Sequence, residues 1–243
     1  MPYLILSDIH SNLEALNAVL ADAQGLHDRI LCLGDLVGYG ADPDPVVEWA
    51  RESVTTIVRG NHDRACCGLD DLEDYNPAAR LSAIWTRRAI SQETRAYLEQ
   101  LPQGPVRVDA GPGGFDLVHG SPFDEDEYVV NLSDVTPWKS KLEATLTFFG
   151  HTHVQGGFIV TPRAVRHITD ASFEMDPEHK YLINPGSVGQ PRDRDPRAAY
   201  AIYTPETRAV EYRRADYDIG AAASKIMIAG LPQILAARLF EGV

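Results

Sequence analysis

Short apolar runs alternate with amphipathic segments along the first sixty residues of the chain. The apolar runs, rich in β-branched and large aliphatic side chains, cover residues 3–7, 29–33 and 54–58. The segments between them repeat apolar residues with helical spacing and cover residues 13–20 and 46–52, with Ser11 or Asn12 as the N-cap of the first. Strands that alternate with helices are typical of a parallel sheet with helices packed on its faces.

The pattern changes after residue 63. Two helical segments at residues 77–90 and 92–101 predict a helical insertion, about residues 64–105, that leans over the ends of the strands. Strand patterns resume at residues 106–109, 115–118, 145–149, 157–160, 165–168, 181–183, 199–203 and 209–213. Further helical segments are expected at residues 133–144, 219–228 and 233–240. This inventory predicts one domain, residues 1–243, in which two sheets pack face to face with helices outside.

Composition narrows the classes of function. The formal net charge of −13 argues against a long nucleic acid as partner, because such binding depends on Lys and Arg side chains that neutralise phosphates. No apolar run reaches the roughly 18 residues that a membrane span needs, so we expect a cytoplasmic protein without a membrane partner. The three cysteines, Cys32, Cys66 and Cys67, form no even framework and predict no disulfide scaffold.

Polar residues follow several of the predicted strands where each strand ends. They are Asp8, His10, Asp35, Asn61, His62, His119, His151 and His153. The carboxyl ends of neighbouring parallel strands meet at one edge of a sheet, so we expect these side chains to lie together. The spacing of Asp8 with His10, like that of His151 with His153, would let each pair project the same way from an extended strand end. Such a mixture of carboxylate, imidazole and amide donors suits two divalent cations of the Mn, Fe or Zn type.

Five motifs containing these residues occur in order along the chain: Asp8-x-His10, Gly34-Asp35-x-x-Gly38, Gly60-Asn61-His62-Asp63, His119, and Gly150-His151-Thr152-His153. Through them the chain resembles the calcineurin-like metallophosphoesterase family. The run Arg59-Gly60-Asn61-His62 is similar to that of the branch with dinucleoside tetraphosphate hydrolases and protein Ser/Thr phosphatases. The resemblance implies an α/β fold, a four-layer α/β/β/α sandwich of two mixed sheets. It also implies two metal ions, one held by Asp8, His10, Asp35 and His153, and the other by Asp35, Asn61, His119 and His151.

The expected activity is that of a di-metal-dependent phosphoesterase, which hydrolyses phosphomonoester, phosphodiester or phosphoanhydride bonds by attack of a metal-activated water. Mn or Fe are the expected ions, with Zn, Ni or Co as alternatives. His62 would protonate the leaving oxygen, Asp63 would orient His62, and Arg59 would clamp a phosphate oxygen. A surface salt bridge is the alternative for Arg59. A protein Ser/Thr phosphatase and a non-catalytic metal-binding scaffold are the alternative functions.

The expected substrate is a small phosphorylated compound, with a nucleotide as one option. Tyr39 and Trp85 would bind it, because an aromatic ring beside a phosphate site can stack on a nucleobase. The alternative for Trp85 is packing of its own helix. Asn184, Ser187 and Arg192 would form a loop that steadies the histidines or touches phosphate, with plain turn formation as the alternative.

Overall fold

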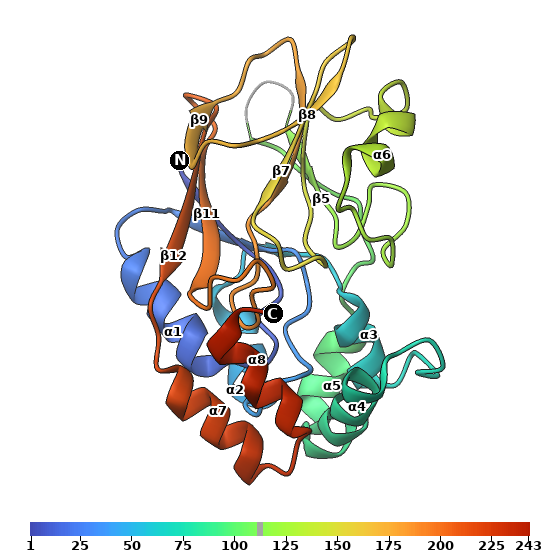
Figure 1. The fold of residues 1–243 in the computed structure, drawn as a ribbon, viewed down its shortest axis with the longest axis vertical. Helices are drawn as coiled ribbons and strands as arrows, with labels where there is room; N and C mark the ends of the chain where they lie inside the picture. The colour runs from blue at the N-terminus through green and yellow to red at the C-terminus, as the bar shows by residue number, and fades with distance from the viewer. Residues whose placement is uncertain (111–113) are drawn as a thin grey trace.

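The computed structural model describes residues 1–110 and 114–243, and within these residues the strands form two six-stranded mixed sheets (Figure 1). Sheet A has the strand order β3 (Thr56–Ile57), β2 (Arg29–Cys32), β1 (Tyr3–Leu6), β11 (Ala198–Thr204), β12 (Ala209–Ala215) and β9 (Ser172–Glu174). Sheet B has the order β4 (Val106–Val108), β5 (Phe115–Leu117), β6 (Leu146–Phe148), β10 (Lys180–Asn184), β7 (Gly156–Val160) and β8 (Val165–His167).

Each sheet contains three parallel strands that end at the same level. In sheet A, β1, β2 and β3 are parallel and hold Leu6, Cys32 and Ile57 in register. In sheet B, β5, β6 and β10 are parallel and hold Leu117, Phe148 and Ile183 in register. The polar motifs follow these strands, so the register brings them to one end of both sheets.

The two sheets pack face to face over a shared apolar core. Its members include Tyr3, Ile5 and Leu31 from sheet A, and Phe115, Phe148 and Ile183 from sheet B. Burial of side chains of this size stabilises the fold by about 1.5–3 kcal/mol each. The aromatic rings also meet edge to face, as Phe115 does with Tyr203 at 5.4 Å between centroids.

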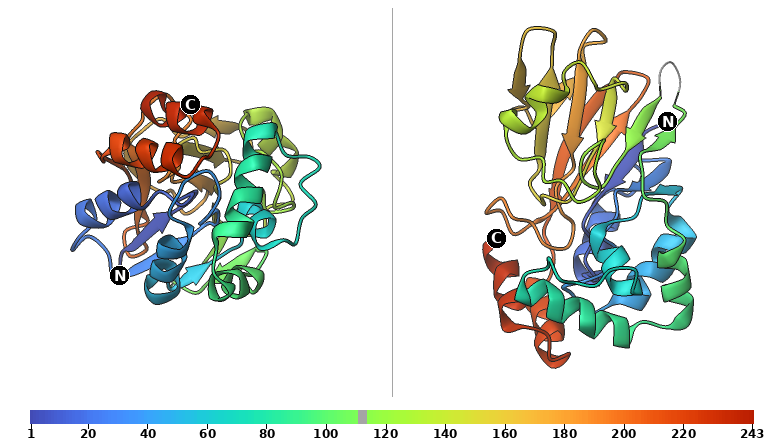
Figure 2. Two further views of the ribbon diagram at one scale, coloured as in Figure 1. Left: turned by 90° about the horizontal axis from the view of Figure 1, so that it is seen from below. Right: turned by 90° about the vertical axis from the view of Figure 1, so that its right-hand side faces the viewer.

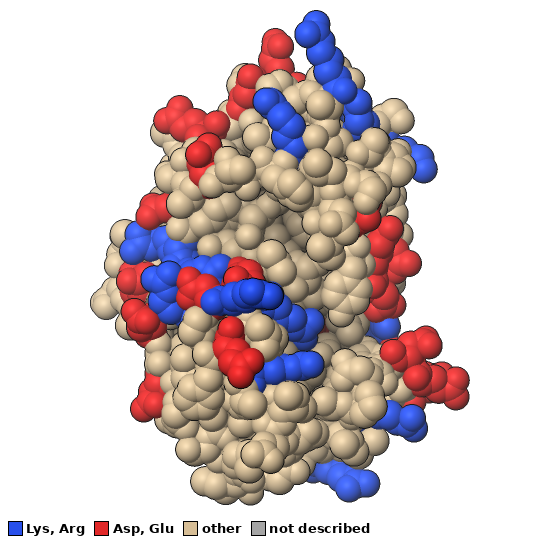
Figure 3. Space-filling view, viewed as in Figure 1, with Lys and Arg blue, Asp and Glu red and all other residues tan. Residues whose placement is uncertain are grey.

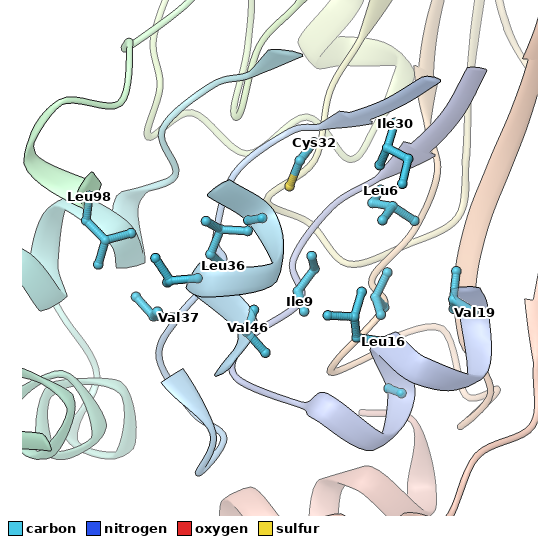
Figure 4. Close-up of a cluster of buried hydrophobic side chains, with 14 of the residues drawn as sticks. Leu6, Ile9, Leu16, Val19, Ile30, Cys32, Leu36, Val37, Val46 and Leu98 are labelled. Carbon is cyan, nitrogen blue, oxygen red and sulfur yellow. The ribbon is translucent and has the colours of Figure 1, made fainter. Parts of the chain in front are cut away.

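Helices cover the outer face of each sheet. On sheet A, α1 (Leu13–Asp22) and α2 (Pro43–Ser53) contribute Leu16 and Val46 to a second core, which Figure 4 shows gathered with Ile9 close to β1 and β2. On sheet B, α6 (Leu132–Val135) and the 3₁₀ helix η1 (Thr136–Trp138) contribute Val135 and Trp138 to another. The predicted α/β/β/α sandwich is therefore confirmed.

The remaining helices lie at the end of the molecule where the parallel strands finish. They are α3 (Asn61–Cys67), α4 (Pro77–Ala89), α5 (Gln92–Glu99), α7 (Ile219–Ile228) and α8 (Gln233–Glu241). The right-hand view of Figure 2 shows most of them below the sheets. The α7–α8 hairpin packs against Ala79 of α4 and against Tyr39 in the loop after β2, which joins the C-terminal helices to the polar end of the sheets.

Several elements differ from the sequence prediction. The motif Gly60-Asn61-His62-Asp63, for which no helix is expected, is the start of α3, since the Asp63 carboxylate accepts the Gly60 N–H at 3.0 Å and so caps a helix. The expected strand at residues 54–58 shrinks to β3, because Val54 ends helix α2 by donating to Ala50 at 2.9 Å. The expected helix at residues 133–144 ends early, because Pro137 has no N–H to continue it.

Charged side chains on the surface are largely interleaved. Figure 3 shows basic and acidic groups alternating in a band across one face. Among the ion pairs of the fold are Arg197 with Asp195 at 2.6 Å and Arg213 with Glu211 at 2.7 Å. In the described part of the chain, no helix combines the length and the apolar character that crossing a membrane requires.

Candidate metal centre

The backbone curls into the left-handed region at the ends of the central strands. The residues with positive φ there include Asp8 (54°), His10 (49°), Asp35 (54°), His151 (65°) and His153 (60°). This conformation is unfavourable for residues other than glycine, and such strain concentrates at functional sites. The extended projection expected from the spacing is thus replaced by a tighter curl that aims each pair inward.

Hydrogen bonds between neighbouring strand ends hold this curled backbone. Asp8 donates its N–H to Gly34 at 3.0 Å, and His10 donates to Asp35 at 3.0 Å. Gly34 itself has φ of 93°, and a Cβ there would lie 2.4 Å from the backbone nitrogen of Gly60. The glycine is therefore needed both for its positive φ and for the close approach of the second motif to the third.

Four of the predicted ligands form one buried group. Ligand atoms of Asp8, His10, Asp35 and His153 all lie within 4.8 Å of one another. The Nε2 atom of His153 is 3.3 Å from Oδ1 of Asp8, and Nε2 of His10 is 3.5 Å from Oδ2 of Asp35. This is the set of side chains predicted for the first ion.

A second group shares Asp35 with the first. Ligand atoms of Asp35, His119 and His151 lie within 4.8 Å of one another. The Nε2 atom of His119 is 3.4 Å from Oδ2 of Asp35 and 3.1 Å from Oδ1 of Asn61. The fold therefore brings together all the residues predicted for the two ions, with Asp35 between them.

Backbone carbonyls fix the tautomers of the four clustered histidines. A carbonyl can only accept a hydrogen bond, so the ring nitrogen facing it carries the proton. The Nδ1 atom of His10 donates to the carbonyl of Val37 (3.0 Å), that of His119 to the carbonyl of Leu33 (2.7 Å), and that of His153 to the carbonyl of Gln190 (2.6 Å). These bonds turn Nε2 of each ring toward the cluster. His151 is reversed, because its Nε2 faces the Asp126 carbonyl at 3.2 Å and leaves Nδ1 for the cluster.

Several buried atoms of the cluster fit a bound cation. Oδ1 of Asp8 and Oδ2 of Asp35 have no hydrogen-bond partner within the described residues, and an unpaired buried carboxylate oxygen is costly. Nε2 of His10 and Nε2 of His153 lie 3.1 Å apart while both Nδ1 atoms bind carbonyls, so two lone pairs face one another. Cations between these donors remove both conflicts, and the mixed O/N set suits borderline divalent metals.

The protonation states agree with a ligand role for most of the cluster. Burial lowers the pKa of His10 and of His153 well below its usual value, so both rings are neutral. Burial also lowers the pKa of His151 to about 3 and raises that of Asp8 to about 7. Burial opposes a charge on His119, but the carboxylate of Asp35 outweighs it and raises the pKa of His119 to about 10.

The loop after β10 supports the ligands from behind. Asn184 donates to the carbonyl of Gly150 and to the hydroxyl of Thr152, both at 2.9 Å, and so braces the turn that carries His151 and His153. Ser187 donates to the carbonyl of Asp8 at 2.8 Å. Both residues have the supporting position that the sequence predicts, and their hydrogen bonds reach backbone and Thr152 rather than the cavity.

His62 and Asp63 occupy the first turn of α3, and they point to different partners. The Asp63 carboxylate accepts backbone N–H groups from Asp35 (2.9 Å), Val37 (3.3 Å) and Gly60 (3.0 Å), so it holds the motifs together instead of orienting His62. The ring of His62 packs against those of His10 and Tyr39, at 5.0 and 4.4 Å between centroids. Burial lowers the pKa of His62 to about 4, which makes the ring neutral without substrate.

Arg59 is engaged in an ion pair. Its Nη2 atom donates to both carboxylate oxygens of Glu125, at 3.0 and 3.1 Å, and only 8% of the Glu125 side chain is exposed. The structure therefore favours the salt-bridge alternative over the predicted phosphate clamp, although the two side chains are mostly buried and do not form a surface pair.

Arg192 is the arginine beside the first ligand group. It donates to the Tyr39 hydroxyl at 3.3 Å and to Oε1 of Gln190 at 3.1 Å, and no carboxylate in the described residues lies within ion-pairing distance of it. Tyr39 is only 4% exposed and packs on His10 at 4.6 Å, so its ring supports the centre and offers little face for stacking. Trp85 packs with the α7–α8 cluster, as the packing alternative predicts.

A cavity of about 250 Å³ opens beside the second ligand group, between His62 and His151. Among its lining residues are four that the sequence analysis does not single out: Arg64, Asp74, Tyr75 and Tyr128. Tyr75 both donates to the Asn61 carbonyl at 2.9 Å and accepts from the Asn61 amide at 3.1 Å, which orients that predicted ligand. Two signals in the sequence could have pointed to this cavity: Arg64 next to a motif, and the acidic residues at 70–74 and 124–127, which alone indicate only solvent-exposed surface.

The sandwich fold and the carboxylate shared between two Asp/His groups define an α/β protein with a candidate dinuclear metal centre. The chain belongs to the calcineurin-like phosphoesterase superfamily, whose family model matches residues 1–208. An uncharacterised protein of Methanocaldococcus jannaschii is 37% identical over 245 residues, covering 98% of this chain and 97% of the relative.

Solved structures agree with this membership. A metallophosphoesterase from Sphaerobacter thermophilus is similar with a TM-score of 0.85 and 40% identity, covering 100% of this chain and 99% of that one. A hypothetical protein from Pyrococcus horikoshii shares the fold with a TM-score of 0.81 and 21% identity, covering 100% of this chain and 98% of that one.

Proposed function

We propose that this chain hydrolyses phosphate esters or phosphoanhydrides of a small molecule with the help of two divalent cations, Mn or Fe being preferred. The observation that carries the proposal is the carboxylate of Asp35, which belongs to both ligand groups and has an unpartnered buried oxygen in the described structure. When bound, two such ions supply an activated water and positive charge for the attacking and leaving oxygens.

Backbone and side-chain groups of the chain hold the predicted metal ligands in place before an ion or substrate binds. Backbone carbonyls orient the histidines, Tyr75 orients Asn61, and Asp63 joins three backbone amides of neighbouring motifs. Because these groups are held before substrate arrives, little reorganisation is needed during reaction, which is the main source of electrostatic catalysis.

Arg192 and His62 are the groups proposed to act on the substrate itself. Arg192 has no carboxylate partner in the described residues and lies beside the first ligand group, which supports a role in binding a phosphate oxygen. His62 lines the cavity and is proposed to protonate the leaving oxygen. Its pKa of about 4 must rise for this role, and a bound phosphate would raise it by its negative charge.

The substrate is proposed to be a small phosphorylated compound, nucleotides included. A cavity of about 250 Å³ is smaller than most sites for drug-sized ligands, and it lies directly against the predicted ligands Asn61 and His151. These dimensions support a small leaving group more than a protein chain. A protein Ser/Thr phosphatase activity remains the alternative that phosphopeptides would test.

The test uses metal-free protein reloaded separately with Mn, Fe, Zn, Ni or Co. Turnover of p-nitrophenyl phosphate and of bis-p-nitrophenyl phosphate is measured for each metal. We expect Mn or Fe to restore activity in the native chain and in Asp28→Asn, a matched change at an exposed carboxylate, but not in Asp35→Asn. Stoichiometric metal binding without turnover of either ester or of a phosphoanhydride such as ATP would instead identify a metal-binding scaffold.

A further inference from the structure

The cavity beside the metal centre carries an excess of negative charge outside the centre itself. Arg64 and three carboxylates, Asp70, Asp74 and Asp126, line it. Arg64 donates to Asp70 at 3.0 Å and to both oxygens of Asp126 at 3.0 Å, so its charge is already neutralised. Asp74 has neither a hydrogen bond nor an ion pair to any of the described residues. An anionic group placed next to Asp74 would therefore meet a carboxylate that no cation of the cavity lining pairs with.

The same cavity presents one open aromatic face. Tyr128 is 53% exposed, and one side of its ring packs on His151 with centroids 3.9 Å apart and planes 35° apart. Tyr75 is partly buried with its hydroxyl bound to Asn61. Tyr128 is thus held in place by a predicted metal ligand while its other face is accessible, which is the arrangement of a stacking platform.

Hydrogen-bonding groups also line the cavity. Asn76 uses its carbonyl oxygen to cap α4 at Ala78 and Ala79, so its amide N–H groups stay available. Asp74 is an acceptor two residues before it. Vicinal hydroxyls of a sugar donate well to a carboxylate, whereas a phosphate would be repelled by it.

We infer that the cavity receives an uncharged aromatic leaving group that carries hydroxyls, such as a nucleoside, and that the substrate contains a single phosphorus atom. The inference rests on the proposed function, which places that phosphorus at the metal centre beside Arg192. The base stacks on Tyr128 and the sugar hydroxyls bind Asp74. A further phosphate between the reacting phosphorus and the sugar would enter the negative part of the cavity, so nucleoside diphosphates, triphosphates and dinucleoside polyphosphates are excluded.

The test compares adenosine 5′-monophosphate with ADP, ATP and glycerol 3-phosphate on the Mn-loaded full chain. We measure kcat/KM for each, and the dissociation constants of AMP and ADP by calorimetry. We expect kcat/KM for AMP to exceed that for glycerol 3-phosphate by about tenfold or more, the effect of one stacked base. It should also exceed the values for ADP and ATP, because their additional phosphates meet the carboxylate of Asp74. ADP or ATP that is bound and hydrolysed better than AMP would overturn the inference.

Variants separate the two features of the cavity. Tyr128→Ala should lower kcat/KM for AMP about tenfold and leave that for glycerol 3-phosphate within twofold, while Tyr128→Phe, which retains the ring, should keep the preference for AMP over glycerol 3-phosphate. Phe123→Ala, an exposed aromatic of the same loop outside the cavity, is the control. Asp74→Asn should raise kcat/KM for ADP relative to that for AMP. Asp71→Asn removes the same charge outside the cavity and should leave this ratio unchanged. Equal losses on AMP and glycerol 3-phosphate in Tyr128→Ala would refute stacking.

The assays also distinguish this inference from the proposed function. Turnover of nitrophenyl esters without preference for AMP would leave the phosphoesterase intact and overturn the cavity assignment. Tight AMP binding that depends on Tyr128, without turnover of any ester, would retain the cavity assignment and overturn catalysis.

Discussion

The backbone carbonyl of Asp126 lies 3.2 Å from Nε2 of His151, and this one contact reverses the ring relative to the other clustered histidines. The carbonyl belongs to a loop fixed by ion pairs. Glu125 binds Arg59 and Arg64, and Arg64 also binds both oxygens of Asp126. The arginine predicted to clamp phosphate thus positions the loop that selects the tautomer of a predicted metal ligand.

Glu125→Gln should weaken the ion site that contains His151. The amide cannot neutralise two arginines, so the loop would loosen and the hydrogen bond to His151 with it. Loss of such supporting contacts typically lowers metal affinity about 10–100-fold. Titration of metal-free protein with Mn should show one ion weakened and the other unchanged. Glu127→Gln, a carboxylate of the same loop without these ion pairs, is the control, and an equal loss at both ions would contradict the assignment.

Asp35→Asn should prevent stable binding of both ions together. Asp35 is the residue common to the two ligand groups, so its neutral replacement leaves two cations without the shared negative charge. Metal content after reloading and desalting measures the outcome by elemental analysis. Near-stoichiometric retention of two ions would contradict the bridging role.

Metal uptake should release protons and strengthen as pH rises. In the metal-free protein Asp35 raises the pKa of His119 to about 10 despite burial, so the ring is protonated at neutral pH. Burial raises the pKa of Asp8 to about 7, so part of that carboxyl is protonated as well. Both must lose a proton to bind a cation, so the apparent Kd falls as pH increases from about 6 to 9.

Calorimetry in buffers of different ionisation enthalpy counts the released protons. We expect between one and two protons per chain at pH 7, fewer in His119→Ala, and the native number in His179→Ala, a change outside the cluster. A proton count near zero in the native chain would contradict the protonation of His119.

Much of this site is predictable from sequence because each strand ends in its own motif. Asp8, Asp35 and His119 follow recognisable apolar runs, and the parallel register of these strands brings the three side chains to one end of the sheets. The direction of a side chain is harder, since it depends on partners far along the chain. Arg59 and Glu125 are 66 residues apart, and nothing local marks them as a pair.

The sequence pattern does not predict the helix that begins after Gly60, for a related reason. A glycine followed by a polar triplet reads as a turn, and only the packing of Asp63 against the backbone of Asp35 and Val37 makes a helix favourable there. The cavity around Tyr128 is likewise a product of tertiary structure, because Tyr75 and Tyr128 come from separate segments. Local propensity therefore predicts where ligands lie, and long-range contacts decide what surrounds them.

Asp63→Ala should destabilise the fold more than a typical polar substitution. Three backbone N–H groups, those of Asp35, Val37 and Gly60, would lose their acceptor, and each unsatisfied buried donor costs about 1–3 kcal/mol. We expect a loss of roughly 3 kcal/mol or more in the free energy of unfolding by urea. Asp63→Asn retains an acceptor oxygen, so its free energy of unfolding should lie between those of the native chain and of Asp63→Ala. A change below about 0.5 kcal/mol in Asp63→Ala, typical of surface sites, would contradict this role.

His62→Ala should retain both metals and slow the chemical step. Loss of a general acid lowers kcat by about 10²–10⁴-fold, and the loss depends on how much the leaving oxygen needs the proton. Alkyl phosphates should therefore suffer the full effect, and nitrophenyl esters, whose leaving group is stable as an anion, much less. Initial rates at saturating substrate and elemental analysis of bound metal give the two measurements, with His179→Ala as the control.

The pH profile decides between an acid and a structural role for His62. Without substrate the buried ring has a pKa of about 4, and the negative charge of bound phosphate raises it. If His62 is the acid, kcat for an alkyl ester falls as pH rises through the pKa of the complex, and this limb disappears in His62→Ala. An equal loss on both ester types with an unchanged profile would mean that His62 only packs against His10 and Tyr39. In that case the leaving oxygen would have to take its proton from water.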